Sequence, residues 1–301
     1  MNKDIIWKSE EEKKEIELYN GILYHYTAVE GLLGIINSNN IWASSFPFLN
    51  DSSEIVYGRR LARSILIKNI DIAKDEISKK IYEECLALNG VEKKRIYITC
   101  FCEKGNLLSQ WRGYGKSGLG FSVGLDSNKL NRVFRKPPYN EIHIKKVIYN
   151  LNTQTRIINK YLEDAIIYAK EKNIVDEKEL KKIARLTDWE IDQNTAYFKD
   201  AAFEEEREWR AMYCDEKNPH TTIETKYRAR SNRIVDYKEF NFSPNNLDIP
   251  FNNKLPLAEI ICGPGVDHES TKEVIKNLLM DREYDVKNIK IEHSSIPFKI
   301  I

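Results

Sequence analysis

The sequence feature that most constrains the fold is the stretch 203–214, in which Glu206, Glu208 and Arg210 lie two residues apart. A period of two predicts a β-strand that carries these three side chains on one face. Glutamate is uncommon in strands, and two carboxylates on one face repel, which raises the pKa of one of them. Such a costly arrangement favours a functional site. The alternative is a salt-bridged edge strand in contact with water.

Composition limits the class of protein. The chain has 301 residues, of which 42% are hydrophobic, so it can bury one large core or two small ones. A net charge of +1 argues against a protein that coats DNA generally. The five cysteines lack paired spacing, and Cys100 and Cys102 lack nearby zinc-ligand partners, so we expect reduced thiols and no metal in a cytoplasmic protein. No apolar run reaches the length of a membrane span, and the N-terminus is not a signal peptide.

The order of apolar patterns predicts short strands separated by helices. Strands are expected at 23–27, 41–45, 95–102, 118–125, 142–149, 257–262 and 287–292. Helices are expected after Thr27, over 55–90, over 151–200 and over 269–280. Because these elements lack a regular βαβ rhythm, we expect a single α+β domain over 1–301, with a split mixed β-sheet core and 151–200 as a helical insertion.

Two local sequence patterns match motifs that have a defined geometry. Thr27 is placed as an N-cap with Glu30 three residues later, which is the pattern of a capping box. The glycines of the segment 113–118 match the dinucleotide fingerprint G-x-G-x-x-G, but that fingerprint precedes a helix. Here a strand follows, which favours a simple turn.

Two further sequence features, a histidine and a basic patch, can each be interpreted as functional or as purely structural. His25 precedes a helix N-terminus that could face an anion, although a lone histidine there is more often a satisfied core residue. Lys226, Arg228, Arg230 and Arg233 form a local basic patch, which is most often a solvated strand or loop. Contact with phosphate or nucleic acid is the alternative for this patch.

Several motifs together resemble a bacterial family of unknown function, the DUF2971 proteins. They occur in order along nearly the whole chain: Leu23-Tyr24-His25-Tyr26-Thr27, Ile41-Trp42-Ala43-Ser44, Leu49-Asn50-Asp51 with Glu54, Cys100-Phe101-Cys102, Gln110-Trp111-Arg112-Gly113-Tyr114-Gly115, Phe203 with Glu206 and Glu208-Trp209-Arg210, and Ile260 to Pro264. The family by itself implies no activity.

A more distant similarity implies an activity. An early strand with His-Tyr-Thr before a helix, and a late strand with Glu-x-Glu, is similar to ADP-ribosyltransferases. The resemblance implies that His25 holds the ribose of NAD, that Glu208 drives transfer, and that Glu206 positions or deprotonates the acceptor. The positions matched to the NAD site are His25, Tyr26, Thr27, Asn50, Glu54, Trp111, Arg112, Tyr114 and Arg210. These spacings are looser than in that family, and the segment 151–200 precedes the acidic strand.

Two classes of function therefore stay open. The first is an enzyme that consumes NAD, either by transferring ADP-ribose to a protein or nucleic-acid acceptor or by hydrolysing NAD, as a toxin or phage-defence effector would. The second is a non-catalytic module that binds a nucleotide or a partner, in which the Glu/Arg residues form a structural network. NAD as substrate is the expected small-molecule partner, with no membrane and no metal. The sequence does not determine the acceptor or the oligomeric state.

Overall fold

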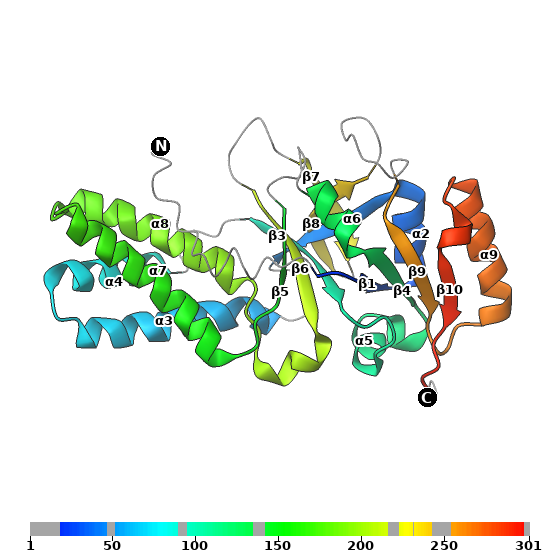
Figure 1. The fold of residues 1–301 in the computed structure, drawn as a ribbon, viewed down its shortest axis with the longest axis horizontal. Coiled ribbons are helices and arrows are strands. Elements are labelled where there is room, and N and C mark those ends of the chain that lie inside the picture. Colours follow the sequence, from blue (N-terminus) through cyan, green and yellow to red (C-terminus); the bar gives the residue numbers. More distant parts are fainter. Residues whose placement is uncertain are drawn as a thin grey trace. The chain divides into compact units, whose positions relative to one another are not determined.

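The computed structural model describes residues 19–46, 52–89, 95–134, 142–215, 223–230, 232–242 and 254–297, without the side chains of residues 52–55 and 230. These residues form two compact units, one helical and one built on a β-sheet (Figure 1). The charged segment 1–20 predicts a short surface helix, and the segment 48–54 predicts a turn, but residues 1–18 and 47–51 lie outside the described residues. The single domain expected over 1–301 stays a prediction.

Four long helices make the helical unit and confirm the helical patterns of 55–90 and 151–200. Apolar side chains at helical spacing, including Ile158, Leu162 and Ala165, form its buried core. The elements of this unit are α3 (Ser52–Ile72), α4 (Glu76–Leu88), α7 (Leu151–Glu171), α8 (Glu177–Thr195) and all but the last residue of the 3-10 helix η3 (Ala201–Glu206).

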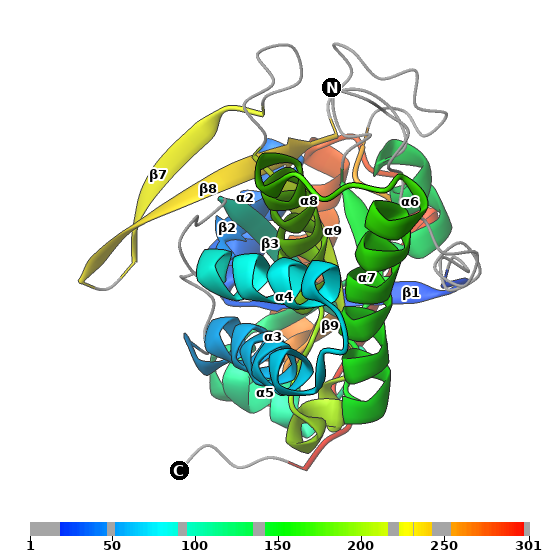
Figure 2. The same ribbon diagram turned by 90° about the vertical axis from the view of Figure 1, so that its left-hand side faces the viewer.

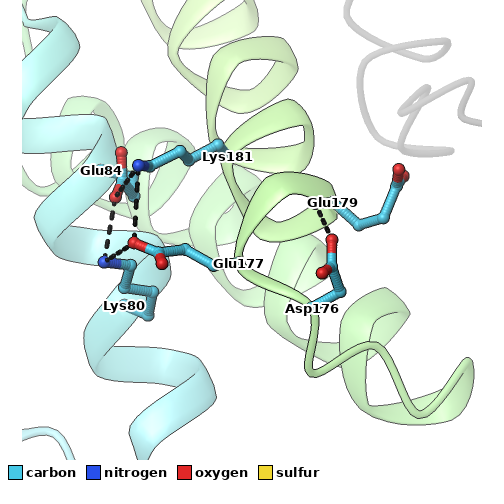
Figure 3. A network of polar contacts seen from close by, with 6 residues as sticks. All are labelled: Lys80, Glu84, Asp176, Glu177, Glu179 and Lys181. Carbon is cyan, nitrogen blue, oxygen red and sulfur yellow. Dashed lines mark hydrogen bonds and ion pairs between the residues drawn. The ribbon is translucent and has the colours of Figure 1, made fainter.

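Charged side chains connect α4 to α8 at the surface of this unit (Figure 3). The Nζ atom of Lys80 lies 2.8 Å from Glu177 and 3.2 Å from Glu84, and the Nζ atom of Lys181 lies 3.4 Å from Glu177. Beside this network, Asp176 caps α8 by accepting a hydrogen bond from the backbone N–H of Glu179. Exposed pairs of this kind contribute about 0–1 kcal/mol each, so the apolar core provides most of the stability of the unit.

The second unit is built on a mixed sheet, as the sequence predicts. Among the described residues the sheet has ten strands, all neighbours being antiparallel except β9 and β10. The strands are β1 (Ile22–Thr27), β2 (Asn40–Ser45), β3 (Ile96–Cys102), β4 (Phe121–Asp126), β5 (His143–Lys146), β6 (Glu208–Cys214), β7 (Thr225–Arg230), β8 (Arg233–Asn241), β9 (Leu257–Cys262) and β10 (Lys290–His293). Their helices are α2 (Val29–Ser38), α5 (Leu108–Gly113), α6 (Ser127–Phe134) and α9 (His268–Asp281).

The sheet forks at β3. One edge of β3 pairs with β6 along its whole length, from Ile96 to Cys102. The other edge is shared, because β2 pairs only with Tyr97 and Ile98, and β1 pairs only with Cys102. Between these points, residues 99–101 have no strand partner on that edge, so β1 and β2 lead away into two separate parts of the sheet.

The two faces of the sheet differ in chemistry. One face is apolar, and α2, α6 and α9 pack on it through side chains such as Leu32, Leu130 and Leu279. The other carries Tyr24, Cys102 and Glu208, and we call it the site face. Since paired residues of an antiparallel ladder point to the same side, the register assigns each side chain to one face. The candidate site is therefore a property of one face of this unit.

Two local predictions are wrong. Glu206 is not on the strand: it ends η3, and Arg207 has a φ of 44°, in the left-handed region that an extended strand does not enter. The strand β6 starts at Glu208. Thr27 is not the cap of α2, because Ala28 occupies the N-cap position without a side-chain hydrogen bond. The hydroxyl of Thr27 instead packs over Gly31.

The two glycines of α2 provide a test of this packing. A Cβ at Gly34 meets nothing within 4 Å, so Gly34→Ala should raise the free energy of unfolding by about 0.5–1 kcal/mol. A Cβ at Gly31 would lie 1.8 Å from Oγ1 of Thr27, so Gly31→Ala should lower it by about 1–3 kcal/mol. Urea unfolding of the two variants measures both effects. An equal increase in the free energy of unfolding of both variants would contradict the packing of Thr27 against α2.

Candidate functional site

One row of paired residues crosses the site face. Glu259 pairs with Gly124, Gly124 with Tyr24, Tyr24 with Cys102, and Cys102 with Glu208. Their side chains therefore share one face, although they come from five strands. Tyr24 and Glu208 are separated by two strand spacings, about 10 Å between Cα atoms. The register thus brings the start of the chain close to the acidic strand.

The glycine in this row allows a hydrogen bond across it. The hydroxyl of Tyr24 donates to Oε2 of Glu259 at 2.6 Å. A Cβ at Gly124 would lie 2.9 Å from the ring of Tyr24 and 3.2 Å from Cβ of Glu259, so a larger residue would push this pair apart. Burial raises the pKa of Tyr24, and the hydrogen bond to the carboxylate raises it further, so the phenol stays protonated.

An aromatic cluster occupies the site face beside this row. Trp111 of α5 is fully buried and packs edge-on against Tyr26, with ring centroids 4.8 Å apart. Cys102 belongs to the same cluster, and Tyr114 packs against it half-buried. The hydroxyl of Tyr26 donates to the carbonyl of Lys104 at 2.7 Å. Trp111 therefore supports Tyr26 from behind, whereas Tyr114 retains exposed surface.

His25 occupies the fork of the sheet. Its Nδ1 lies 2.9 Å from the carbonyl oxygen of Cys100, in the segment of β3 that pairs with β6 but with neither β1 nor β2. A carbonyl can only accept, so Nδ1 carries the proton. Burial lowers the pKa of His25, the hydrogen bond to Cys100 acts in the opposite direction, and the charge of Arg228 lowers it again. The ring is therefore neutral near pH 7, and its Nε2 is a hydrogen-bond acceptor.

Glu208 and Arg210 form a buried ion pair. The Nε atom of Arg210 donates to Oε1 of Glu208 at 2.7 Å, and Nη2 donates to Oε2 at 3.0 Å. Arg210 is 0% exposed and Glu208 is 5% exposed. A planar guanidinium that binds both oxygens fixes the plane of the carboxylate. The alternation of β6 therefore creates a rigid, charged pair on the site face.

Further carboxylates surround Cys102. Burial raises the pKa of its thiol to about 11, and the charges of Glu103, Glu206 and Glu208 contribute in the same direction. Burial alone would raise the pKa of Glu103, but hydrogen bonds from Lys146 and Trp209 outweigh it and lower that pKa. Half-buried Glu206 thus remains near Glu208 although it is not on the strand. The environment is acidic, and the thiol of Cys102 is not an activated nucleophile.

The remaining predicted residues are distributed more widely. Arg112 is exposed on the last turn of α5, and Thr27 ends β1. Asn50 lies outside the described residues, and Glu54 lies in α3 without a described side chain. The convergence of all these residues on one NAD site stays a prediction. His25 and Tyr26 are neighbours on β1, so strand alternation places Tyr26 on the site face and His25 on the opposite side, where its hydrogen bond to Cys100 holds the ring at the fork.

Sequence reasoning missed the partnership of Tyr24 with Glu259. The two residues are 235 positions apart, and their contact depends on the order β9-β4-β1 in the sheet. In the segment 118–125, Gly118, Gly120 and Gly124 alternate with apolar residues, and this glycine face is the sequence signal that something packs close to that strand. Within the described ranges, no group of three or more His, Cys, Asp or Glu side chains could hold a metal ion. No described helix is long and apolar enough to cross a membrane.

The fold and these residues define an α+β protein with a forked mixed sheet and a buried Glu–Arg pair on one face. A family model described as a protein of unknown function (DUF2971) matches residues 110–211, about a third of the chain. The matched range contains the α5 turn and the Glu208–Arg210 pair, and it supports the family assignment suggested by the motifs. Comparison with curated proteins and with solved structures gave no match.

The neutral state of His25 predicts a pH dependence of stability. Because the folded state binds the proton less readily than the unfolded chain, the free energy of unfolding should fall as the pH drops below about 6.5 towards the folded-state pKa. His25→Asn keeps a donor for the carbonyl of Cys100 but does not titrate. Its stability should therefore fall less between about pH 7 and about pH 5 than that of the wild type. Denaturant unfolding at several pH values measures this, and an identical pH dependence of the two proteins would exclude a lowered pKa of His25 in the folded state.

Proposed function

We propose that the protein consumes NAD, breaking the bond between nicotinamide and ribose and transferring ADP-ribose to an acceptor or to water. The observation that supports this most is the placement of His25 and Glu208 on either side of β3. His25 lies where β1 leaves β3, and Glu208 pairs with the last residue of β3 on its other edge. A split sheet with an early histidine and a late glutamate is also what the resemblance to the ADP-ribosyltransferase fold implies.

The proposed reaction assigns a specific task to Glu208. As the bond between C1′ of the ribose and the ring nitrogen breaks, the electron pair leaves with neutral nicotinamide and positive charge develops on the sugar. A fixed carboxylate stabilises this oxocarbenium-like state. The acceptor, or water, then forms a bond to C1′ and releases a proton. Arg210 is a positioning residue in this scheme, since its two hydrogen bonds hold the carboxylate of Glu208 ionised and oriented.

His25 has a complementary task in binding. With Nδ1 donating to the carbonyl of Cys100, the neutral ring presents Nε2 as an acceptor suited to a ribose hydroxyl. Tyr114 is the aromatic residue proposed to stack on nicotinamide, because it retains exposed surface where Trp111 does not. Each residue therefore acts on a different part of NAD.

Neutralising Glu208 tests the assignment directly. Glu208→Gln keeps the size and shape of the side chain, so release of nicotinamide should fall about a hundredfold or more while the protein still folds. Glu259→Gln is the matched control, because Glu259 is also a buried carboxylate of the site face, hydrogen-bonded to Tyr24. Its turnover per folded molecule should equal that of the wild type. Free nicotinamide and thermal unfolding are measured on the same samples, and full turnover in Glu208→Gln would exclude catalysis by this residue.

Glu206 is proposed to act on the acceptor side. It precedes β6, is half-buried and is not part of the bidentate pair. Glu206→Gln should therefore reduce transfer to an acceptor by about tenfold or more and leave hydrolysis of NAD nearly unchanged. The ratio of ADP-ribosylated acceptor to free ADP-ribose, measured by mass spectrometry, reports this difference. An equal loss in both products would remove the distinction between Glu206 and Glu208.

One observation favours a second candidate function, a non-catalytic module that binds a nucleotide or a partner. Both oxygens of Glu208 accept from Arg210, and the carboxylate is almost fully buried. In that case the pair is structural, and breaking it should cost about 3–5 kcal/mol of stability. Early melting of Glu208→Gln, together with no nicotinamide release by the wild type, would support the module.

A further inference from the structure

The hairpin of β7 and β8 extends past the body of the sheet. The pairing of β2 with β8 starts at Tyr237, whereas the pairing of β7 with β8 continues to the pair Arg230–Arg233. The segments 227–230 and 233–236 therefore form a two-stranded ribbon without a third strand. Figure 2 shows this hairpin reaching away from the other strands of its unit. We call residues 225–230 and 232–237 the basic ribbon.

The charge of the basic ribbon is strongly asymmetric. It contains Lys226, Arg228, Arg230 and Arg233, against the single acidic residue Asp236, in a chain whose net charge is +1. Arg233 is exposed and, among the described residues, makes no ion pair. Lys226 pairs with Glu239 at 2.8 Å but remains 42% exposed at its side chain. Cations held on a projecting ribbon match a row of phosphates.

Aromatic rings accompany these cations. Trp42 of β2 is 37% exposed, and its ring lies 4.6 Å from that of Tyr237. The guanidinium of Arg228 lies 5.0 Å from the Trp42 ring and donates to the hydroxyl of Ser44 at 2.8 Å. On the other face of the ribbon, Tyr227 is 65% exposed. Exposed rings beside cations are the elements that bind unpaired bases by stacking.

The register connects this aromatic and basic surface to the site face. Ser44 pairs with Ile98, and Ile98 pairs with Met212 of β6. By alternation, Trp42 lies on the same face as Ser44, and Arg210 on the same face as Met212. A ligand held at Trp42 would therefore lie on the face that carries the Glu208–Arg210 pair.

We propose that the basic ribbon and Trp42 bind single-stranded nucleic acid, with the cations on phosphates and the Trp42 ring on a base. Unpaired bases are required because stacking on a side chain replaces stacking on a neighbouring base. The assignment of this strand as the acceptor of ADP-ribose rests on the proposed function. The binding of the strand does not rest on the proposed function, because binding needs neither NAD nor Glu208.

Fluorescence anisotropy of a labelled single-stranded oligonucleotide of about 20 nucleotides, with the full chain and without NAD, tests the proposal. Affinity should fall steeply between about 50 mM and about 200 mM salt. Arg233→Gln should weaken binding roughly fivefold and reduce the salt slope by about 0.7. Arg185→Gln, an exposed arginine of α8 in the helical unit, is the matched control and should change neither quantity.

The stacking residue gives an independent readout. Trp42→Ala should weaken binding about tenfold without changing the salt slope, and Trp42→Phe should restore most of the affinity. The proposal would be overturned if Arg185→Gln weakened binding as much as Arg233→Gln does, or if polyglutamate bound as tightly as the oligonucleotide. Either result would indicate a general attraction of polyanions. Tighter binding of a duplex would overturn the single-strand assignment. Because NAD is absent, loss of NAD cleavage and loss of strand binding are separate results.

Discussion

The shared edge of β3 is the constraint on which the sheet depends. Both β1 and β2 attach to this edge, but at opposite ends, so residues 99–101 pair with neither of these two strands there. A buried carbonyl without a hydrogen bond is costly, and the imidazole of His25 satisfies that of Cys100. The hydroxyl of Thr99 stays buried without a partner among the described residues. The fork is thus stabilised by a side chain where a continuous sheet would use a strand.

The Glu208–Arg210 ion pair contributes to the structure in a different way from the hydrogen bond of His25. Two charges removed from water gain little net stability from their attraction, because each loses its hydration. An apolar pair at the same positions would fit the β-propensity of β6 better. The ion pair fixes the orientation of Glu208, because the two hydrogen bonds from Arg210 hold its carboxylate in a single plane. In the proposed function, this fixed orientation is the property that would stabilise positive charge at one point of the substrate.

The periodicity of the sequence was sufficient for the elements that are long or strongly alternating, such as α7, α8, β1 and β9. It missed α5 because six residues are too few to establish a period. It missed β8 because charged residues lie on both faces of that strand. Tertiary contacts make this possible, since Lys238 is buried over the rings of Tyr97 and Tyr213. In the candidate site, the spacing of Glu208 and Arg210 indicated their shared face. The strand order that places Tyr24 beside Glu259 had no local signal.

Under the two proposals, the fork would let one face of the sheet serve two ligands. Because β1 and β2 diverge from the same edge, the aromatic residues of each part of the sheet stay on one face without contacting each other directly: Tyr26 packs with Trp111, and Trp42 packs with Tyr237. Both parts remain anchored to β3, whose opposite edge holds Glu208 and Arg210. A small molecule bound beside β1 and a polymer bound beside β2 would then approach the same carboxylate from two directions. In the proposed function, the fork would let a donor and an acceptor share a single acidic strand, because a continuous sheet would place only one of these surfaces next to β3.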